Sequence, residues 1–292
     1  MHTTLISVAE LAQLLTAPSH TAGVRVFDCS FDLMNPALGS QQFAEAHIPG
    51  ATHANLDQHL SAHGGSVAAG TAASGGRHPL PTREVFAQWL GSMGVDNGTQ
   101  VVVYDRNGVN YAGRLWWMLK WCGHEAVAVL DGGLQAWTAA GETLASGPAH
   151  TPSPQPFALA APAVSLADTA TVHGRLGQPN QTVLDARAAP RFRGEVEPLD
   201  PIAGHVPGAL NRPFATNLGE DGRFKPAATL RQEFDALLAG RDPATVVHHC
   251  GSGVSAVPNV LAMELAGLGR QALYAGSWSE WSNTPGLPVE RG

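Results

Sequence analysis

Cys250 is the residue of this chain best placed to act as a nucleophile. It opens the heptapeptide CGSGVSA, between an apolar run at 245–249 and an apolar helical pattern at 257–265. Gly251 and Gly253 let the backbone curl so that amide N–H groups point inward, and the positive end of the following helix adds to them. Because cysteine reacts as the thiolate, such a nest makes Cys250 reactive near neutral pH. A core cysteine beside a tight turn is the alternative.

Length and composition fit two compact domains of ordinary size, each able to bury its own core. Cys29, Cys122 and Cys250 are too few and too scattered for a disulfide framework, and no CxxC pair or spaced His/Cys cluster predicts a metal site. Free thiols, together with an N-terminus that lacks a basic leader or a long apolar run, lead us to expect a cytoplasmic protein without a membrane partner. A formal net charge of −7, with 17 dispersed Lys and Arg residues, argues against a nucleic-acid partner.

Three short sequences occur twice in the same order, which indicates a duplicated domain. HIPGA at 47–51 recurs as HVPGA at 205–209, VFD at 26–28 as VLD at 183–185, and LDGGLQAW at 130–137 as YAGSWSEW at 274–281. Five prolines between positions 141 and 163 suit an extended linker. We therefore expect a first domain over 1–143, a linker over 144–162 and a second domain over 163–292.

Short β-branched runs alternate with amphipathic stretches in each half. Capping boxes at Ser7–Glu10 and Ser165–Asp168 predict the start of the first helix of each half. Strands without polar alternation, interleaved with helices, indicate an α/β fold in which each domain has a mostly parallel sheet with helices on both faces. Ligands of such sheets lie beyond the carboxyl ends of the strands, where Cys250 is expected. The patterns predict strands at 24–28, 101–104, 183–185 and 245–249, and helical faces at 85–93 and 230–238.

The CGSGVSA loop resembles the active-site loop of the rhodanese family of sulfurtransferases, and its CGSG opening is most similar to the 3-mercaptopyruvate sulfurtransferase branch. HVPGA and YAGSWSEW resemble other signatures of that family and stand in the expected order, so the resemblance covers nearly all 292 residues. It implies tandem rhodanese-like domains, a cysteine that carries sulfur as a persulfide, and no metal or organic cofactor.

The first half lacks the nucleophile. Aligning the strand at 102–105 with the sequence at 247–250 places Asp105 where Cys250 stands. Aspartate cannot accept a sulfur atom, so we expect the first domain to be catalytically silent. His47 and His205 belong to sequences present in both halves, and we interpret them as turn and packing elements.

Two arginines of the second half are candidates for binding an anionic donor. By resemblance, the arginine of the Arg-Phe-x-Gly segment, here Arg191, contacts the donor beside the cysteine, because a charged fork matches a carboxylate or a thiosulfonate. A plain surface position is the alternative for Arg191. Arg187 follows Asp185 by two residues, so it either faces the donor or pairs with Asp185.

The mercaptopyruvate branch usually has a second arginine nine residues after the first, where this chain has Asp200. This departure weakens the case for 3-mercaptopyruvate. Thiosulfate-selective members instead carry two cations in the loop, where this chain has Gly251 and Ser252. We therefore favour 3-mercaptopyruvate as the donor, with thiosulfate as the alternative.

Two residues of the first half are candidates to complete the site. Asp57 and His78 resemble the aspartate and histidine that the mercaptopyruvate branch couples to the serine of its CGSG loop, here Ser252. An aspartate that orients a histidine, which in turn polarises a hydroxyl, is a general acid–base arrangement. A solvated loop histidine is the alternative for His78.

The expected reaction is a two-step transfer. The Cys250 thiolate attacks the sulfur of a small anionic donor and keeps it as a persulfide, and a thiol such as thioredoxin or a small dithiol, or cyanide, then removes it. Backbone amides of the loop hold the terminal sulfur. The loop residues expected to contact the substrate are Gly251, Gly253, Val254 and Ser255.

Two other functions compete with sulfur transfer. A cysteine phosphatase also places its nucleophile in a nested loop before a helix, but it needs an arginine six positions after the cysteine, where this chain has Ala256. The second is a rhodanese-fold binding or regulatory module without activity, which the intact thiol and its nest disfavour. Thiocyanate release from protein loaded with a sulfur donor would distinguish an enzyme from such a module.

Overall fold

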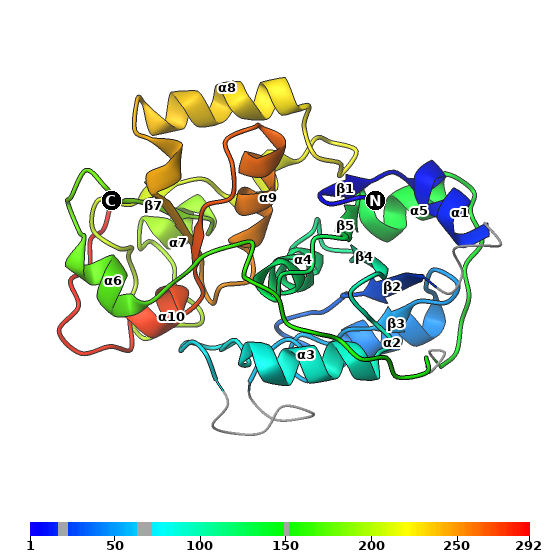
Figure 1. Cartoon of the computed structure of the whole chain (residues 1–292). Helices are drawn as coiled ribbons and strands as arrows, with labels where there is room; N and C mark the ends of the chain where they lie inside the picture. The colour runs from blue at the N-terminus through cyan, green and yellow to red at the C-terminus, as the bar shows by residue number, and fades with distance from the viewer. Residues whose placement is uncertain (17–22, 63–71, 149–151) are drawn as a thin grey trace. The chain divides into compact units, whose positions relative to one another are not determined.

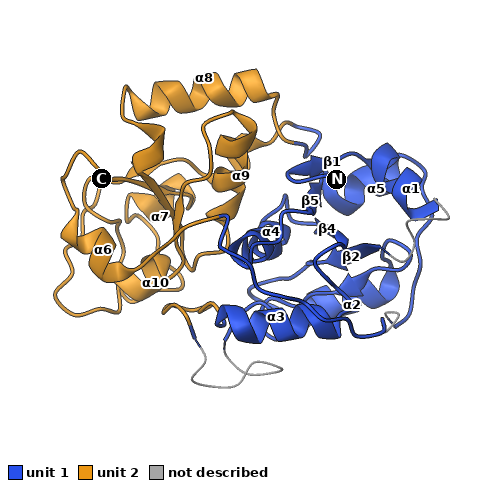
Figure 2. Ribbon diagram, viewed as in Figure 1, with its two compact units in different colours: residues 1–72, 81–163, 220–223 blue, residues 73–80, 164–219, 224–292 orange. Residues whose placement is uncertain are grey.

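The computed structural model describes residues 1–16, 23–62, 72–148 and 152–292 (Figure 1). The chain forms two compact units, shown in separate colours in Figure 2. Each unit has its own five-stranded sheet, which confirms the predicted α/β duplication. Residues 149–151 of the expected linker lie outside the described residues. Unit 1 comprises residues 1–72, 81–163 and 220–223, and unit 2 comprises residues 73–80, 164–219 and 224–292.

Unit 1 is built on a parallel sheet with the strand order β1-β5-β4-β2-β3. Its strands are β1 (Leu5–Ile6), β2 (Val24–Asp28), β3 (Thr52–His53), β4 (Gln100–Tyr104) and β5 (Val127–Leu130). Its helices are α1 (Val8–Thr16), α2 (Leu38–Glu45), α3 (Arg83–Ser92), α4 (Ala112–Trp121) and α5 (Gly133–Ala139).

Helices cover both faces of the unit 1 sheet. Val26, Val102 and Leu130 belong to a core cluster that also contains residues of α1, α2 and α5. Phe27 points to the opposite face, where its ring lies 5.7 Å from the ring of Trp89 on α3. Burial on both faces explains why the strands are apolar without alternation.

Unit 2 repeats this arrangement with the parallel strand order β6-β10-β9-β7-β8. Its strands are β6 (Leu166–Ala167), β7 (Thr182–Asp185), β8 (Leu210–Asn211), β9 (Val246–His249) and β10 (Ala272–Tyr274). Its α-helices are α6 (Thr169–Gly174), α7 (Ala189–Phe192), α8 (Ala227–Leu238), α9 (Val257–Leu265) and α10 (Ser277–Trp281), with 3-10 turns η1 (Phe214–Asn217) and η2 (Pro243–Thr245).

The unit 2 sheet lies between two groups of helices. Val183 and Val247 pack with residues of α6 and α10 on one face, and α8 and α9 lie on the other (Figure 1). The chain leaves β7 toward β8 and leaves β9 toward β10, in opposite directions across the sheet. The carboxyl ends of β7 and β9 therefore flank a topological switch point, where ligands of open α/β sheets bind. Cys250 follows β9 at this point.

The four predicted strands are β2, β4, β7 and β9, and the observed bounds agree with the predicted ones to within one residue. The two predicted helical faces belong to α3 and α8. Phe234 and Leu238 of α8 are buried as expected, because they lie on one side of a helix with 3.6 residues per turn.

One of the two predicted helix starts is correct. Ser7 and Glu10 form a capping box, in which the Ser7 amide donates to Glu10 Oε2 (2.9 Å) and the Glu10 amide donates to Ser7 Oγ (3.3 Å). The start predicted at Ser165 is wrong. Asp168 caps α6 by accepting from the Thr171 amide (2.7 Å), because the residues between Ser165 and Asp168 extend as β6 beside β10.

His47 and His205 have the same packing role in their units. His47 Nδ1 contacts the Phe43 carbonyl oxygen at 2.8 Å, and the two rings stack with centroids 4.0 Å apart. His205 Nδ1 contacts the Phe192 carbonyl oxygen at 2.8 Å, and those rings stack at 3.8 Å. In each unit the repeated histidine therefore packs the turn that contains it against a preceding helix, which is α2 for His47 and α7 for His205.

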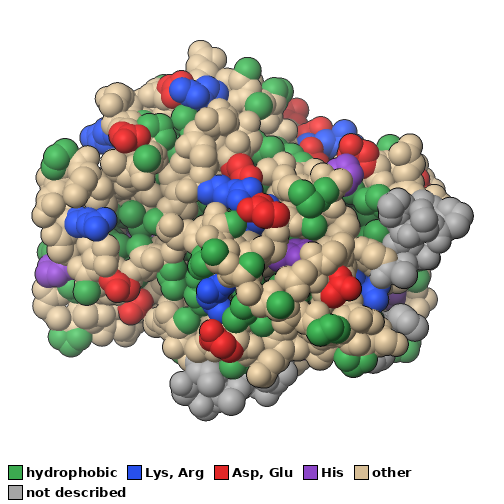
Figure 3. All heavy atoms as spheres, viewed as in Figure 1, with side chains coloured by type: hydrophobic (Ala, Val, Ile, Leu, Met, Phe, Trp, Pro, Cys, Tyr) green, Lys and Arg blue, Asp and Glu red, His purple; other side chains and the backbone are tan. Residues whose placement is uncertain are grey.

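On the face of the molecule drawn in Figure 3, Lys and Arg side chains are scattered among acidic ones and do not gather into a patch. This distribution agrees with the sequence, in which acidic residues outnumber basic ones by 24 to 17. Among the described residues, none of the helices combines the length and apolar character needed to span a membrane.

Candidate active site

Cys250 lies in a tight turn between β9 and α9, as the sequence predicts. Its side chain is buried, with the residue 1% exposed, and Pro258 occupies the first turn of α9. Gly253 has φ +72°, and a Cβ there would lie 2.2 Å from the Ala275 carbonyl oxygen. Glycine is therefore required at 253 both by the backbone conformation and by the close approach of the Ala275 backbone, which follows β10.

The first residues of α10 form hydrogen bonds with this loop. The amides of Trp278 and Ser279 donate to the carbonyl oxygens of Cys250 (3.0 Å) and Gly251 (2.8 Å). Ser277 adopts φ +55°, a strained conformation for a residue with a side chain, and its Oγ accepts from the Cys250 amide at 3.1 Å. These contacts hold the carbonyl oxygens of Cys250 and Gly251 against the first turn of α10.

The same loop in unit 1 shows what such a turn of amides binds. Asp105 stands at the position of Cys250, and its buried carboxylate accepts four backbone hydrogen bonds. Burial raises the pKa of Asp105, and the four hydrogen bonds counteract part of that rise. The loop conformation is therefore an anion cradle, which a carboxylate fills in unit 1. The donors to Asp105 are the amides of Asn107 (2.8 Å), Val109 (3.0 Å), Tyr111 (2.9 Å) and Ala112 (2.9 Å).

The structure brings His78 to Ser252. His78 Nδ1 lies 2.7 Å from Ser252 Oγ, and the two residues are 4% and 7% exposed. Both belong to unit 2, because the short segment 73–80 is part of that unit. Asp57 lies in unit 1, where its amide donates to Asn55 Oδ1 (2.9 Å), and its coupling to His78 stays a prediction.

Arg187 is buried among partners of its own. Its guanidinium donates to both carboxylate oxygens of Asp185 (2.7–3.2 Å) and to the Gly204 carbonyl oxygen (2.7 Å), and it lies 3.4 Å from Glu197 Oε2. Its planar group also stacks on the ring of Trp278, 4.7 Å from the centroid. This geometry favours the alternative in which Arg187 is the structural partner of Asp185.

Arg191 belongs to α7 and reaches the nucleophile loop. Its Nη2 donates to Glu197 Oε1 (2.6 Å) and to Asp200 Oδ2 (3.2 Å). A Cβ at Gly251 would lie 3.4 Å from Arg191 Nη1, so this edge of the guanidinium borders the loop. Arg191 is therefore partly buried beside the loop rather than extended into solvent.

Asp200 also binds a second arginine. Arg77 Nη1 donates to Asp200 Oδ1 at 2.8 Å, and the Arg77 amide donates to Ser279 Oγ at 2.9 Å. A Cβ at Gly251 would lie 3.5 Å from Arg77 Nη2. Arg77 and Arg191 therefore border the same loop residue, and one buried carboxylate binds both.

The histidines of β9 support the sheet behind the nucleophile. Burial lowers the pKa of His248 to about 3. Burial also lowers the pKa of His249, and the neighbouring Asp185 carboxylate counteracts part of that decrease. Burial alone raises the pKa of Asp185, but His249 and Arg187 outweigh it and hold that pKa below its usual value. Within the described parts of the chain, no group of three or more His, Cys, Asp and Glu residues is placed to hold a metal ion.

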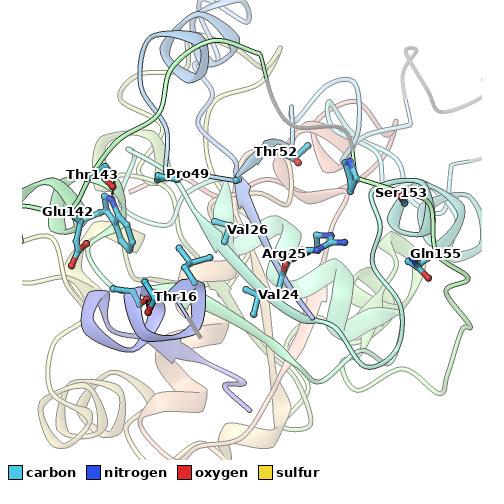
Figure 4. Close-up of a pocket in the computed structure, with 15 residues that line it drawn as sticks. Thr16, Val24, Arg25, Val26, Pro49, Thr52, Glu142, Thr143, Ser153 and Gln155 are labelled. Atoms are coloured by element: carbon cyan, nitrogen blue, oxygen red, sulfur yellow. Dashed lines mark hydrogen bonds between the residues drawn. The ribbon is translucent and has the colours of Figure 1, made fainter. Parts of the chain in front are cut away.

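The cavity in Figure 4 belongs to the scaffold of unit 1. It has a volume of about 660 Å³ and is lined around Val24, Arg25 and Val26 of β2 and around Pro49 and Gly50. The corresponding turn of unit 2, with Pro207 and Gly208, lines a similar hollow. Because the two hollows occupy repeated positions of the fold, we assign neither of them to the chemistry of Cys250.

A smaller hollow of about 540 Å³ lies in unit 2 next to the paired arginine and aspartate. Arg77, Asp200 and Ser279 line it. Ser279 also donates its amide to Gly251, so this hollow adjoins the nucleophile loop.

Two residues that contact the loop or its partners, Ser277 and Arg77, are not among the predicted site residues. Ser277 stands where the first half has Gly133, which has φ +58°, so a serine at a glycine position was the available signal. Arg77 has no such signal, because its role depends on Asp200, 123 residues away.

Comparison with known proteins agrees with this arrangement. The Rhodanese-like domain family matches residues 7–140 and 168–284. The chain is 47% identical over 287 residues to a Pseudomonas aeruginosa protein named probable 3-mercaptopyruvate sulfurtransferase, covering 96% of this chain and 99% of that protein. It is 34% identical over 280 residues to the thiosulfate sulfurtransferase of Gallus gallus, covering 95% and 92% of the two chains. The crystal structure of SseA from Escherichia coli, a 3-mercaptopyruvate sulfotransferase, matches with a TM-score of 0.76 and 30% identity, over 95% of this chain and 100% of that one.

Proposed function

The chain belongs to the rhodanese-like family of sulfurtransferases, and we propose that it moves a sulfane sulfur from an anionic donor to a thiol through a persulfide on Cys250. The observation that carries this proposal is the position of Cys250 in the turn between β9 and α9, where the repeated turn of unit 1 has Asp105. That turn of unit 1 binds the carboxylate of Asp105 with four amides. The same turn around Cys250 suits a thiolate and then the terminal sulfur of a persulfide.

In the first step the Cys250 thiolate attacks the sulfur of the donor. An S–S bond forms and the bond between sulfur and the rest of the donor breaks, so the bonding electron pair leaves with the leaving group. For 3-mercaptopyruvate the leaving group is the pyruvate enolate, which takes a proton. The Ser252 hydroxyl, 2.7 Å from His78 Nδ1, is the group we assign to that proton transfer.

In the second step a thiolate acceptor attacks the terminal sulfur of the persulfide. A new S–S bond forms on the acceptor, the Cys250–sulfur bond breaks, and the Cys250 thiolate is regenerated with its electron pair. A small dithiol or thioredoxin fits this role. Cyanide attacks the same sulfur through its carbon, so a C–S bond forms instead and thiocyanate is released. The two steps need no metal or organic cofactor, because the cysteine itself carries the sulfur.

Arg191 is assigned to the anionic group of the donor, because its Nη1 edge borders Gly251 of the loop. Arg187 is assigned a positioning role, since Asp185, Glu197 and Gly204 take up its N–H groups. The amides of Gly253, Val254 and Ser255 are assigned to the persulfide, and Asp57 is proposed to orient His78.

We favour 3-mercaptopyruvate as the donor. Relatives with that name resemble the chain over nearly its full length, and the serine–histidine contact is useful only for a leaving group that needs a proton. Thiosulfate is the second candidate, because a relative from Gallus gallus carries that activity in its name. The free thiols of Cys29, Cys122 and Cys250 fit a reducing compartment, and we propose the cytoplasm.

Mass spectrometry of the donor-treated protein tests the proposal. Wild-type protein should gain one sulfur, about 32 Da, and Cys250→Ser should gain none. Cys29→Ser is the matched control, because Cys29 is also buried but follows β2 in the unit without a nucleophile, and it should load normally. A sulfur adduct on Cys250→Ser would contradict the assignment. Side-by-side kcat/KM values for 3-mercaptopyruvate and thiosulfate, with one acceptor, then decide the donor.

A further inference from the structure

Two guanidinium groups border the nucleophile loop at the same place. A Cβ at Gly251 would lie 3.4 Å from Arg191 Nη1 and 3.5 Å from Arg77 Nη2. Arg191 reaches this place from α7, and Arg77 reaches it from the segment that carries His78. A molecule bound beside this pair of guanidinium groups would therefore meet N–H groups of both arginines.

Asp200 holds the two guanidinium groups in this arrangement. Its Oδ1 accepts from Arg77 Nη1 (2.8 Å) and its Oδ2 accepts from Arg191 Nη2 (3.2 Å), while its own side chain is 2% exposed. The Arg77 backbone is fixed as well, because its amide donates to Ser279 Oγ. A carboxylate that bridges two arginines restricts their rotamers, so their remaining N–H groups are directed before any ligand binds.

Neither arginine uses all its donors within the protein. In the described parts of the chain, the Nε atoms of Arg77 and Arg191 are buried and have no hydrogen-bond partner. Each guanidinium has five N–H donors, and a bound carboxylate or sulfonate accepts several of them at once. A buried N–H group without an acceptor destabilises the protein. A ligand that accepts a hydrogen bond from such a group removes this penalty, which favours binding.

We propose that Arg77 is a second donor-binding residue of this site, which together with Arg191 binds the anionic oxygens of the sulfur donor, and that Asp200 is the positioning residue for both. This inference rests on the proposed sulfurtransferase function and specifies how its donor is recognised. Arg77 thereby supplies the second guanidinium group that the mercaptopyruvate branch usually has at the position of Asp200.

The charges around the pair indicate which anion fits. Alternating ion pairs join three arginines to three carboxylates, so their formal charges cancel. Binding then depends on directed N–H groups more than on excess positive charge, which suits a planar monoanion such as the carboxylate of 3-mercaptopyruvate better than a dianion. The six residues are Asp185, Arg187, Glu197, Arg191, Asp200 and Arg77.

Single-turnover kinetics on the full chain test this proposal. Loading of Cys250 from 3-mercaptopyruvate and unloading of the persulfide by the uncharged dithiol dithiothreitol are measured separately. Arg77→Ala should slow loading at subsaturating donor roughly 10–100-fold, as expected for the loss of a hydrogen bond between charged groups, and leave unloading within about twofold of wild type. Arg191→Ala should give the same pattern, and Arg77→Lys should restore part of the loading rate.

Arg193→Ala is the matched control, because Arg193 is exposed and pairs with Glu195, and it should load and unload as wild type does. Equal loading by Arg77→Ala and wild type, or equal slowing of loading and unloading, would overturn the role of Arg77. Binding of pyruvate to the Cys250→Ser protein, followed by calorimetry, gives a readout without turnover, and Arg77→Ala should weaken it. If wild-type protein never forms the persulfide, the proposed function fails instead, so the two failures are distinguishable.

Discussion

Removal of the Ser252 hydroxyl should impair one sulfur donor and spare the other. The hydroxyl lies 2.7 Å from His78 Nδ1, and the low exposure of both residues leaves little room for water to replace it. The pyruvate enolate must be protonated as it leaves, whereas sulfite leaves thiosulfate as a stable anion. Ser252→Ala should therefore lower kcat for 3-mercaptopyruvate roughly 10–100-fold, about 1.4–2.7 kcal/mol in barrier, and leave thiosulfate nearly unchanged.

His78→Gln should give the same donor-selective loss, because glutamine retains polarity but cannot exchange a proton. If the two side chains act as one unit, the double variant should be no slower than the slower single variant. Steady-state assays with each donor and a common thiol acceptor measure all three variants. Ser255→Ala, in the same loop, is the comparison for general disturbance of the backbone.

Two outcomes would refute this reasoning. Equal losses for both donors would mean that Ser252 and His78 only support the loop. No loss for either donor would remove the proton transfer, and with it the main mechanistic reason to favour 3-mercaptopyruvate over thiosulfate.

Three further predictions concern the loop and the sheet that carries it. Asp105→Ala should lower the free energy of unfolding, measured by urea titration, by about 2–4 kcal/mol. Roughly 1 kcal/mol is lost for each of the four hydrogen bonds, and removal of a buried carboxylate offsets part of that loss. Cys250→Ala should lower the free energy of unfolding by less than half as much. Gly253→Ala should slow persulfide formation at least about tenfold, because the new methyl meets the backbone of Ala275. Gly267→Ala, which has a similar φ but open space, should load normally. His248 has a pKa of about 3 in the fold, so wild type should lose stability as pH falls below the unfolded-state value of 6.5. His248→Gln should lose about 1.4 kcal/mol less than wild type between about pH 7.5 and 5.5, and an unchanged pH slope would contradict the assignment.

Local patterns predicted the elements that carry the site. β9 and α9 follow from apolar periodicity on either side of CGSGVSA, and the tight turn between them follows from two glycines. These features depend on residues next to one another in the chain, which is why sequence reasoning reached them. The wrong helix start at Ser165 shows the limit of such patterns, because pairing with β10 extends the two residues that a capping box would have placed in a helix.

Residue spacing alone could not predict the contacts between segments that are far apart in the sequence. His78 and Ser252 are 174 residues apart, and only the family resemblance suggested that they meet. The alternative roles of Arg187 could not be separated either, because burial against Trp278 and Gly204 is a property of the folded chain. Resemblance supplied candidates, and the contacts of each candidate then distinguish a ligand-facing group from a structural one.

The contacts of Asp200 in the fold change how its presence at position 200 is interpreted. In the sequence it is an acid where the mercaptopyruvate branch usually has an arginine, which argues against that donor. In the fold it accepts from Arg77 and Arg191, and it brings both guanidinium groups to Gly251. A substrate meets N–H groups at positions in space, and the position in the chain that supplies them is immaterial to binding. An acid that recruits a distant arginine is therefore compatible with a carboxylate donor, and the departure at position 200 no longer counts against 3-mercaptopyruvate unless Arg77 proves dispensable for loading.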